Sequence, residues 1–265
     1  MITTIFFMSS IETNISKPLF RAPHIFSGFA GLIAAESTRH GGVSKAPYAS
    51  LNLGGSQDDP ADVLENNIRF FNALNVPFET VAKSHQVHDD KILNVEDPGR
   101  FDGYDALITN KTNIQLAVTI ADCTPILIFD PVTRSVAAIH AGWRGTVKGI
   151  AAKTIAMLQS EFGSDPADCV AYIGTCIDEC SFEVGEDVSE HFEGKYKRFD
   201  SGKQKYFVDL KASNRDQLLA SGLPEENIEV SPFSTVLNND DYFSYRLEKG
   251  FTGRLLATIG MTDRG

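Results

Sequence analysis

The chain has 265 residues, enough to bury a sizeable core, and its 42% hydrophobic and 22% charged residues are ordinary for a globular protein. Its net charge of −11 argues against non-specific nucleic-acid binding, which needs a basic surface. No apolar run reaches the ~18 residues of a membrane-spanning helix, and the apolar start MITTIFFMSS lacks the basic flank of a signal peptide. We therefore expect a cytoplasmic protein with reduced or metal-bound cysteines, and a frayed start or edge strand at residues 1–10.

The first elements in chain order surround a long loop. Residues 26–34 (FSGFAGLIA) predict a strand. The segment Thr38–Gly54 is rich in Gly, Ser and Pro and predicts a loop. A helix is expected at Pro60–Leu74, because the preceding Asp-Asp pair and Pro60 are typical of a helix start.

Short strands dominate the rest of the chain. They are expected at Ala106–Thr109, Gln115–Ile120, Pro125–Phe129, Val136–His140, Val170–Ile173 and Leu255–Ile259. Helices are expected at Thr146–Phe162, Val184–Phe192 and Leu210–Ser221; the first carries Val147, Ile150, Ile155 and Leu158 on one face and stops at Gly163. Strands outnumber helices and do not alternate with them, which favours an α+β fold over a doubly wound sheet, as one domain spanning residues 1–265.

Two of the predicted strands bring a cysteine and a histidine together. The runs Pro125–Phe129 and Val136–His140 flank the turn-like hexapeptide DPVTRS. In an antiparallel hairpin Phe129 faces Val136, so Pro125 faces His140 and Cys123 lies at the same open end. Such a pair suits two ligands of a metal such as zinc, a nucleophile with its base, or a buried structural thiol beside a hydrogen-bonded histidine.

A third candidate ligand comes from the segment SHQVHDD, which holds His85 and His88. On a strand their separation of three places them on opposite faces, and spacing alone does not choose between them. One histidine beside Cys123 and His140 would complete a three-ligand site. Three protein ligands leave an open position, which is typical of catalytic rather than structural zinc.

Several motifs together carry a family resemblance. The chain contains, in order, TRHGGVSKAPYASLNLG, SHQVH, ADCTPILIF, HAGWRG, FEVG and YFSYRLEKGFTGR. Over about residues 38–253 it closely resembles the bacterial family labelled laccase-domain or polyphenol oxidase proteins. That family is also named zinc-dependent purine nucleoside phosphorylase and peptidoglycan editing factor.

The resemblance implies a fold, an activity and a metal site. The fold is two mixed β-sheets packed together with flanking helices. The activity is phosphorolysis of adenosine or inosine to ribose 1-phosphate and free base, with adenosine deamination and methylthioadenosine cleavage in relatives. The implied zinc ligands are His88, Cys123 and His140, with His88 chosen because it occupies the QVH position.

The sequence departs from the family pattern at two places. Asp89 and Asp90 follow QVH where the family usually has Gly, so two carboxylates either change the charge near the metal or face solvent. The segment before FSYR contains no cysteine, where the family usually has one, which puts a role for a second thiol in doubt. Cys176 and Cys180 are expected to be buried thiols.

The turn HAGWRG offers an anion site for phosphate. We expect a helix to begin near Thr146 with free N–H groups, beside Arg144 as a bidentate donor and catalytic residue, or as a plain surface arginine. Trp143 is expected to pack in the core or to stack on a base.

Other residues are candidates for substrate contact. Arg39, in the glycine-rich loop, is expected to bind an anion or ribose. Asp122 is expected to orient a ligand or cap a turn. Glu183 is expected to contact substrate or to be an acid at a helix start, and the resemblance adds Phe243, Tyr245 and Arg246 as pocket residues.

Three other functions remain as alternatives. Copper would bind the same ligands and give polyphenol oxidase activity, although six histidines are too few for a multicopper oxidase. A Cys123–His140 hydrolase would act on an amide in peptidoglycan precursors and survive chelation. A non-enzymatic module would close its metal site with four ligands. We expect a monomer or homodimer that binds a purine nucleoside and phosphate, without nucleic acid or membrane partners.

Overall fold

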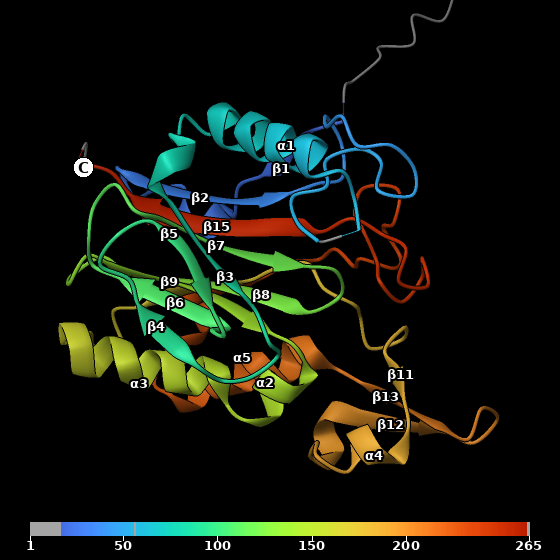
Figure 1. Ribbon diagram of the computed structural model, residues 1–265. Helices are drawn as coiled ribbons and strands as arrows, with labels where there is room; N and C mark the ends of the chain where they lie inside the picture. The colour runs from blue at the N-terminus through green and yellow to red at the C-terminus, as the bar shows by residue number, and fades with distance from the viewer. Residues whose placement is uncertain (1–16, 56, 264–265) are drawn as a thin grey trace, which may run out of the picture.

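The protein is described by a computed structural model over residues 17–55 and 57–263, so the expected edge strand at residues 1–10 lies outside the described residues. Two six-stranded mixed sheets pack face to face with helices on their outer faces, and a small three-stranded sheet protrudes at one corner (Figure 1). This α+β arrangement is the expected one. No helix in the described part of the chain is long and apolar enough to cross a membrane.

The first large sheet has the strand order β1-β2-β15-β7-β3-β5. Its strands are β1 (Phe20–Arg21), β2 (Leu32–Ser37), β3 (Val81–His85), β5 (Gly99–Asp102), β7 (Gln115–Ile120) and β15 (Leu255–Met261). β3 runs parallel to β5 and β7, and the other neighbours are antiparallel.

The second large sheet has the order β14-β10-β8-β9-β6-β4. Its strands are β4 (Ile92–Asn94), β6 (Ala106–Thr109), β8 (Thr124–Asp130), β9 (Ser135–Ala141), β10 (Val170–Ile173) and β14 (Ile228–Val230). The small sheet consists of β11 (Glu183–Val184), β12 (Lys197–Asp200) and β13 (Lys205–Val208).

Helices cover the outer faces of the large sheets, except α4, which packs on the small sheet (Figure 1). They are α1 (Pro60–Ala73), α2 (Trp143–Val147), α3 (Ile150–Phe162), α4 (Glu186–Ser189) and α5 (Leu210–Ala220). Phe70 and Phe71 of α1 pack on the first sheet, whereas α3 and α5 pack on the second (Figure 1). Asp59 caps α1 by accepting a hydrogen bond from the backbone N–H of Ala61.

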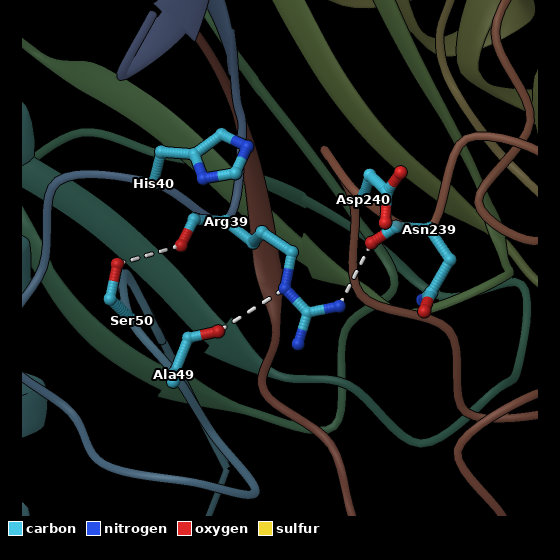
Figure 2. A pocket seen from close by; sticks show the side chains of 6 residues that line it. All are labelled: Arg39, His40, Ala49, Ser50, Asn239 and Asp240. Carbon is cyan, nitrogen blue, oxygen red and sulfur yellow. Dashed lines mark hydrogen bonds between the residues drawn. The ribbon is translucent and has the colours of Figure 1, made fainter. Parts of the chain in front are cut away.

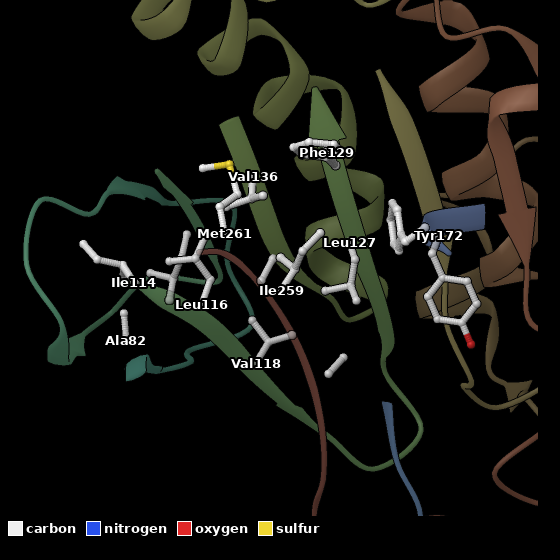
Figure 3. Packing of buried hydrophobic residues seen from close by; sticks show 14 of the residues in the cluster. Ala82, Ile114, Leu116, Val118, Leu127, Phe129, Val136, Tyr172, Ile259 and Met261 are labelled. Carbon is white, nitrogen blue, oxygen red and sulfur yellow. The ribbon is translucent and has the colours of Figure 1, made fainter. Parts of the chain in front are cut away.

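The main core lies between the two sheets and follows the alternation of strand side chains. Leu127 and Val136 of the β8/β9 hairpin point into this layer beside Leu116, Val118 and Ile259 of the first sheet (Figure 3). The intervening hairpin residues face the helices instead. His140 has the same parity as Val136 on β9, so its side chain emerges at the open end of the inter-sheet layer.

Most predicted elements are confirmed, and three are wrong in part. The first strand is β2, at Leu32–Ser37, rather than at 26–34, where part of the apolar run forms a 3-10 turn. The helix expected at Thr146–Phe162 is two helices, because Gly149 adopts φ +78° between α2 and α3. The helix expected at Val184–Phe192 is reduced to the single turn α4, since Val184 belongs to β11.

Candidate metal centre

The β8/β9 hairpin brings Cys123 and His140 to one end of the molecule. Its register pairs Phe129 with Val136 and Pro125 with His140, as the sequence predicts. Cys123 precedes β8 directly, in the three-residue connection from β7. Cysteine and histidine therefore meet at the open end of the hairpin.

His88 supplies the third side chain, and His85 does not. His85 ends β3 and is exposed, opposite Asp102 of β5. The chain then turns, and His88 adopts the left-handed backbone conformation with φ +59°. The ring of His88 lies edge-on to that of His140, with 4.8 Å between the ring centroids.

The three side chains form a compact group of metal-binding atoms. One ligand atom from each of His88, Cys123 and His140 lies within 4.8 Å of the others. His140 is buried, Cys123 is half-buried and His88 is exposed, so the group opens toward solvent on the His88 side. A thiolate and two imidazoles suit zinc, which takes such ligands at about 2.0–2.3 Å and accepts substrate at a fourth position.

Gly142 leaves the space beside these ligands open. A Cβ atom at this position would lie 3.1 Å from Cδ2 of His88 and 3.2 Å from Sγ of Cys123. Both distances are shorter than ordinary van der Waals contact. The glycine after β9 is thus required by the close approach of the ligand side chains.

Asp105 holds His140 and the His88 loop in position through hydrogen bonds. It is fully buried, and its Oδ1 accepts a hydrogen bond from His140 Nδ1 at 2.7 Å. This bond holds the proton on Nδ1 and leaves Nε2 of His140 as the metal-binding atom. The same carboxylate accepts hydrogen bonds from the backbone N–H groups of Val87, His88 and Asp89. One side chain therefore fixes both the imidazole and the His88 loop.

The ionised forms of the side chains in this group stabilise one another. Burial opposes ionisation of Cys123, but His140 and His88 outweigh it and lower the pKa of the thiol to about 6. Burial likewise disfavours the His140 imidazolium, whereas Cys123 and Asp105 raise the pKa of His140 to about 9. Hydrogen bonds from His140 and the backbone outweigh burial and hold the pKa of Asp105 below its usual range. A thiolate, the form that binds metal, is favoured here.

The expected helix start at Thr146 is wrong, whereas anion binding by Arg144 stays a prediction. The helix α2 begins at Trp143, and the N–H of Thr146 already donates to the carbonyl of Gly142 at 2.9 Å. Arg144 is exposed and stacks on the Trp143 ring. Trp143 itself packs against the apolar cluster of the small sheet and stacks on His191.

Arg39 lies in a structural network that borders an open pocket. Its guanidinium pairs with Glu248 at 3.0 Å, donates to the carbonyls of Ala49 and Asn239, and stacks on Phe243. The pocket of about 350 Å³ is lined by Arg39, His40, Ala49, Ser50, Asn239 and Asp240 (Figure 2). Its polar lining makes this face of the glycine-rich loop a candidate for ligand contact.

Asp122 connects the cysteine loop to the C-terminal loop rather than to a metal ligand. Its Oδ1 accepts from Thr235 Oγ1 and its Oδ2 accepts from the backbone N–H of Arg246, both at 2.6 Å. The guanidinium of Arg246 donates to the carbonyl of Glu183 at 2.8 Å. The Glu183 side chain pairs with Lys203. The structure thus brings Arg246 and Glu183 into contact. Glu183 lies in β11 rather than at a helix start.

The two unusual carboxylates after His88 face lysines of the neighbouring helices. Asp89 pairs with Lys148, and Asp90 pairs with Lys153. Both pairs are exposed to solvent, and in each pair the lysine offsets the charge of the carboxylate. Of the two remaining cysteines in question, Cys176 is buried as expected, but Cys180 is exposed, which corrects that prediction.

Sequence reasoning overlooked two residues of this region. Asp105 was missed because it is 35 residues from His140 and only the β6/β9 pairing brings them together. A single acid at the entry to a fully apolar strand is the signal that indicates it. Arg254, in the GFTGR motif, received no role although it directly precedes β15.

Comparisons with known proteins show a matching family and similar relatives. Residues 33–262 match the family described as multi-copper polyphenol oxidoreductase laccase. Purine nucleoside phosphorylase YlmD of Geobacillus stearothermophilus is 36% identical over 252 residues, covering 89% of this chain and 92% of the relative. Purine nucleoside phosphorylase YfiH of Escherichia coli is 37% identical over 235 residues, covering 86% and 93%. The crystal structure of YlmD from Geobacillus stearothermophilus superposes with a TM-score of 0.85 at 34% identity, covering 92% of this chain and 99% of that chain.

Proposed function

The chain belongs to the family described as multi-copper polyphenol oxidoreductase laccase, and from that premise we propose that it is a single-domain, zinc-dependent purine nucleoside phosphorylase. The observation that carries the proposal is the convergence of His88, Cys123 and His140, with their ligand atoms within 4.8 Å of one another and one side open. The curated relatives are named purine nucleoside phosphorylases, which gives the reaction.

The reaction exchanges one bond at the anomeric carbon. An oxygen of phosphate bonds to C1′ while the bond from C1′ to the purine nitrogen breaks. The base leaves with the electron pair and takes up a proton. When bound, zinc would supply a positive centre that stabilises developing negative charge.

The chain's own residues prepare this site. Asp105 keeps the proton on His140 Nδ1, so Nε2 is available, and the same carboxylate fixes the His88 loop. Gly142 keeps the space beside the ligands clear. We assign substrate contact to Arg246 and Glu183, which contact each other, and to Arg39 at the pocket of Figure 2. We assign it also to Arg144 at the solvent side of α2.

The metal and the compartment are part of the proposal. One thiolate and two imidazoles form a single three-ligand group among the described residues, which favours one zinc over a multicopper centre. We place the protein in the reducing cytoplasm, where its four cysteines, none of them in a disulfide, would stay reduced.

The test is product analysis of purified, zinc-loaded protein with adenosine or inosine, with and without phosphate. We expect free base and ribose 1-phosphate only when phosphate is present. Cys123→Ala should lose both zinc and turnover, whereas Cys180→Ala, which removes the exposed thiol, should keep both. Full activity and metal content in Cys123→Ala would contradict the proposal, and inosine formed from adenosine without phosphate would indicate a deaminase instead.

One observation favours a second candidate, a cysteine hydrolase acting on an amide. Cys123, His140 and Asp105 stand in the order of a nucleophile, its base and the acid that orients the base. Such an enzyme would keep its activity after zinc removal by a chelator. The phosphorylase would lose activity on chelation and regain it when zinc is returned.

A further inference from the structure

The structure contains a second cavity, between the glycine-rich loop and the segment that leads into β15. It measures about 130 Å³ and is lined by Tyr48, Asn52, Gly54, Gly55, Gln57, Asp58, Thr252 and Arg254. This volume is several times the ~30 Å³ share of a water molecule but well below the ~300 Å³ of a typical small-molecule pocket. It therefore suits a small ion rather than a whole nucleoside.

Strand register places Arg254 close to the cysteine ligand. Leu255 of β15 pairs with Ile120 at the end of β7, so Arg254 comes opposite Ala121, two residues before Cys123. Burial lowers the pKa of the Arg254 guanidinium, and the phenol of Tyr245 and the thiolate of Cys123 act against this shift. The register thus places Arg254 at the sheet edge that carries Cys123.

The charge of Arg254 is left without an acidic partner. Within residues 17–55 and 57–263, no carboxylate forms an ion pair with it, whereas Arg39 is paired with Glu248. Its Nη1 donates to the carbonyls of Thr252 and Gly253, and no acceptor in the described chain takes the hydrogens of Nε and Nη2. A half-buried cation with free donors beside a polar cavity is the arrangement that binds an anion.

The loop that carries the cavity is fastened to Arg254 itself. The backbone N–H of Arg254 donates to Asn52 Oδ1 at 2.8 Å, and its carbonyl accepts from the N–H of Leu53 at 2.9 Å. Asp58 is the one acid in the lining, and its oxygens already accept hydrogen bonds from Ser44, Asn52 and the N–H of Asp59. These bonds hold the cavity in shape and occupy its negative group.

We propose that Arg254 binds the phosphate co-substrate in this cavity, at the sheet edge that also carries Cys123, and so delivers the attacking oxygen. The proposal rests on the phosphorylase function given above. Arg254, whose guanidinium also lies over the ring of Tyr245 at 5.5 Å, would bind phosphate in addition to the substrate contact assigned to Arg144. Tyr48 and Asn52, on the glycine-rich loop, line the same cavity.

The test is the kinetics of Arg254→Gln and Arg254→Lys with phosphate and adenosine varied separately. Loss of a charge-assisted bidentate contact should raise KM for phosphate by about 10- to 100-fold in Arg254→Gln, with KM for adenosine little changed. Arg254→Lys should recover part of this loss. The matched control is Arg69→Gln, an exposed arginine paired with Glu65 on α1, which should behave as wild type. Zinc content and thermal unfolding of each variant establish that the fold and the metal are retained.

Two results would overturn the proposal without touching the phosphorylase function. One is an unchanged KM for phosphate in Arg254→Gln, and the other is an equal rise of both KM values, which would indicate a structural role. If the wild type shows no phosphorolysis at all, the proposed function fails first. Calorimetric titration of inorganic phosphate into zinc-loaded protein then tests phosphate binding by Arg254 independently of turnover. Binding that is lost in Arg254→Gln supports the subsite, and absence of binding to the wild type refutes it.

Discussion

Asp105→Asn is the sharpest test of how the metal centre is organised. The carboxylate accepts four hydrogen bonds: from His140 Nδ1 and the N–H of His88 on Oδ1, and from the N–H groups of Val87 and Asp89 on Oδ2. An amide has one acceptor oxygen, so its NH2 group must face two of these donors. If it faces the two donors on Oδ2, the partly buried N–H groups of Val87 and Asp89 lose their acceptor. If it faces His140, the imidazole proton moves to Nε2 and blocks the metal-binding atom.

The expected size of the effect follows from these contacts. Each lost bond to a charged acceptor costs about 1.5–3 kcal/mol, so the loss of two should lower the unfolding free energy by about 3–6 kcal/mol. Loss of the partner that orients a histidine ligand should weaken zinc binding by about 10- to 100-fold. Zinc affinity is measured by competition with a chromogenic chelator, and stability by urea unfolding in chelator.

Asp130→Asn is the matched control for this experiment. Asp130 is also fully buried and accepts hydrogen bonds from Val132 and Thr133, but it lies at the far end of the same hairpin. It should lose stability while keeping wild-type zinc affinity. Wild-type zinc affinity in folded Asp105→Asn would refute the orienting role of Asp105.

Three further changes test other parts of the structure. Gly142→Ala would place a Cβ 3.1 Å from His88 and 3.2 Å from Cys123, so zinc affinity should fall about 10-fold in the same competition assay; an unchanged affinity would mean that the ligands have more room than the geometry indicates. Gly149→Ala forces a side chain into φ +78°, so unfolding free energy should fall by about 1–2 kcal/mol without a change in zinc content, and a gain in stability would show that α2 and α3 can join. Burial outweighs the hydrogen bonds of Glu36 and raises its pKa above 4.5, so the native chain holds this proton at pH values where the unfolded chain has lost it. The quantity to measure is the unfolding free energy of the wild type minus that of Glu36→Gln. It should fall as pH rises above 4.5, by up to ~1.4 kcal/mol per pH unit, until the pKa of Glu36 in the native chain is passed. A difference that stays constant between about pH 5 and 8 would contradict this expectation.

The sequence was most informative where local pattern and structure coincide. The apolar runs of β8 and β9 flank one turn, and counting from the pair Phe129–Val136 gives the observed partner of His140. Helix α1 begins at the proline that follows its capping acid. Both features depend on neighbours in the chain, so propensity and turn chemistry suffice to predict them.

The sequence was least informative where one apolar pattern fits either one helix or two, and where a residue's partner is distant in the chain. The apolar spacing from Val147 to Leu158 continues through Gly149, and only the positive φ of that glycine breaks the helix. The role of Asp105 depends on the pairing of β6 with β9, and that of Arg254 depends on the pairing of β15 with β7. Such contacts are set by the tertiary fold and leave no periodic signal.

The position of the site follows from the topology of the two sheets. β3 is parallel to β7, and β15 is antiparallel to it, so the end of β3, the end of β7 and the start of β15 share one edge. The connection from β7 to β8 crosses from the first sheet to the second at this edge and carries Cys123. His140 ends β9 beside it, His88 follows β3, and Arg254 precedes β15. The metal ligands and the proposed phosphate-binding arginine therefore come from both sheets. Their spacing depends on how the sheets pack. A cavity made between the sheets, as by Leu127→Ala, should consequently weaken zinc binding even though Leu127 is a core residue and not a ligand, because the core sets the distance between the two halves of the centre.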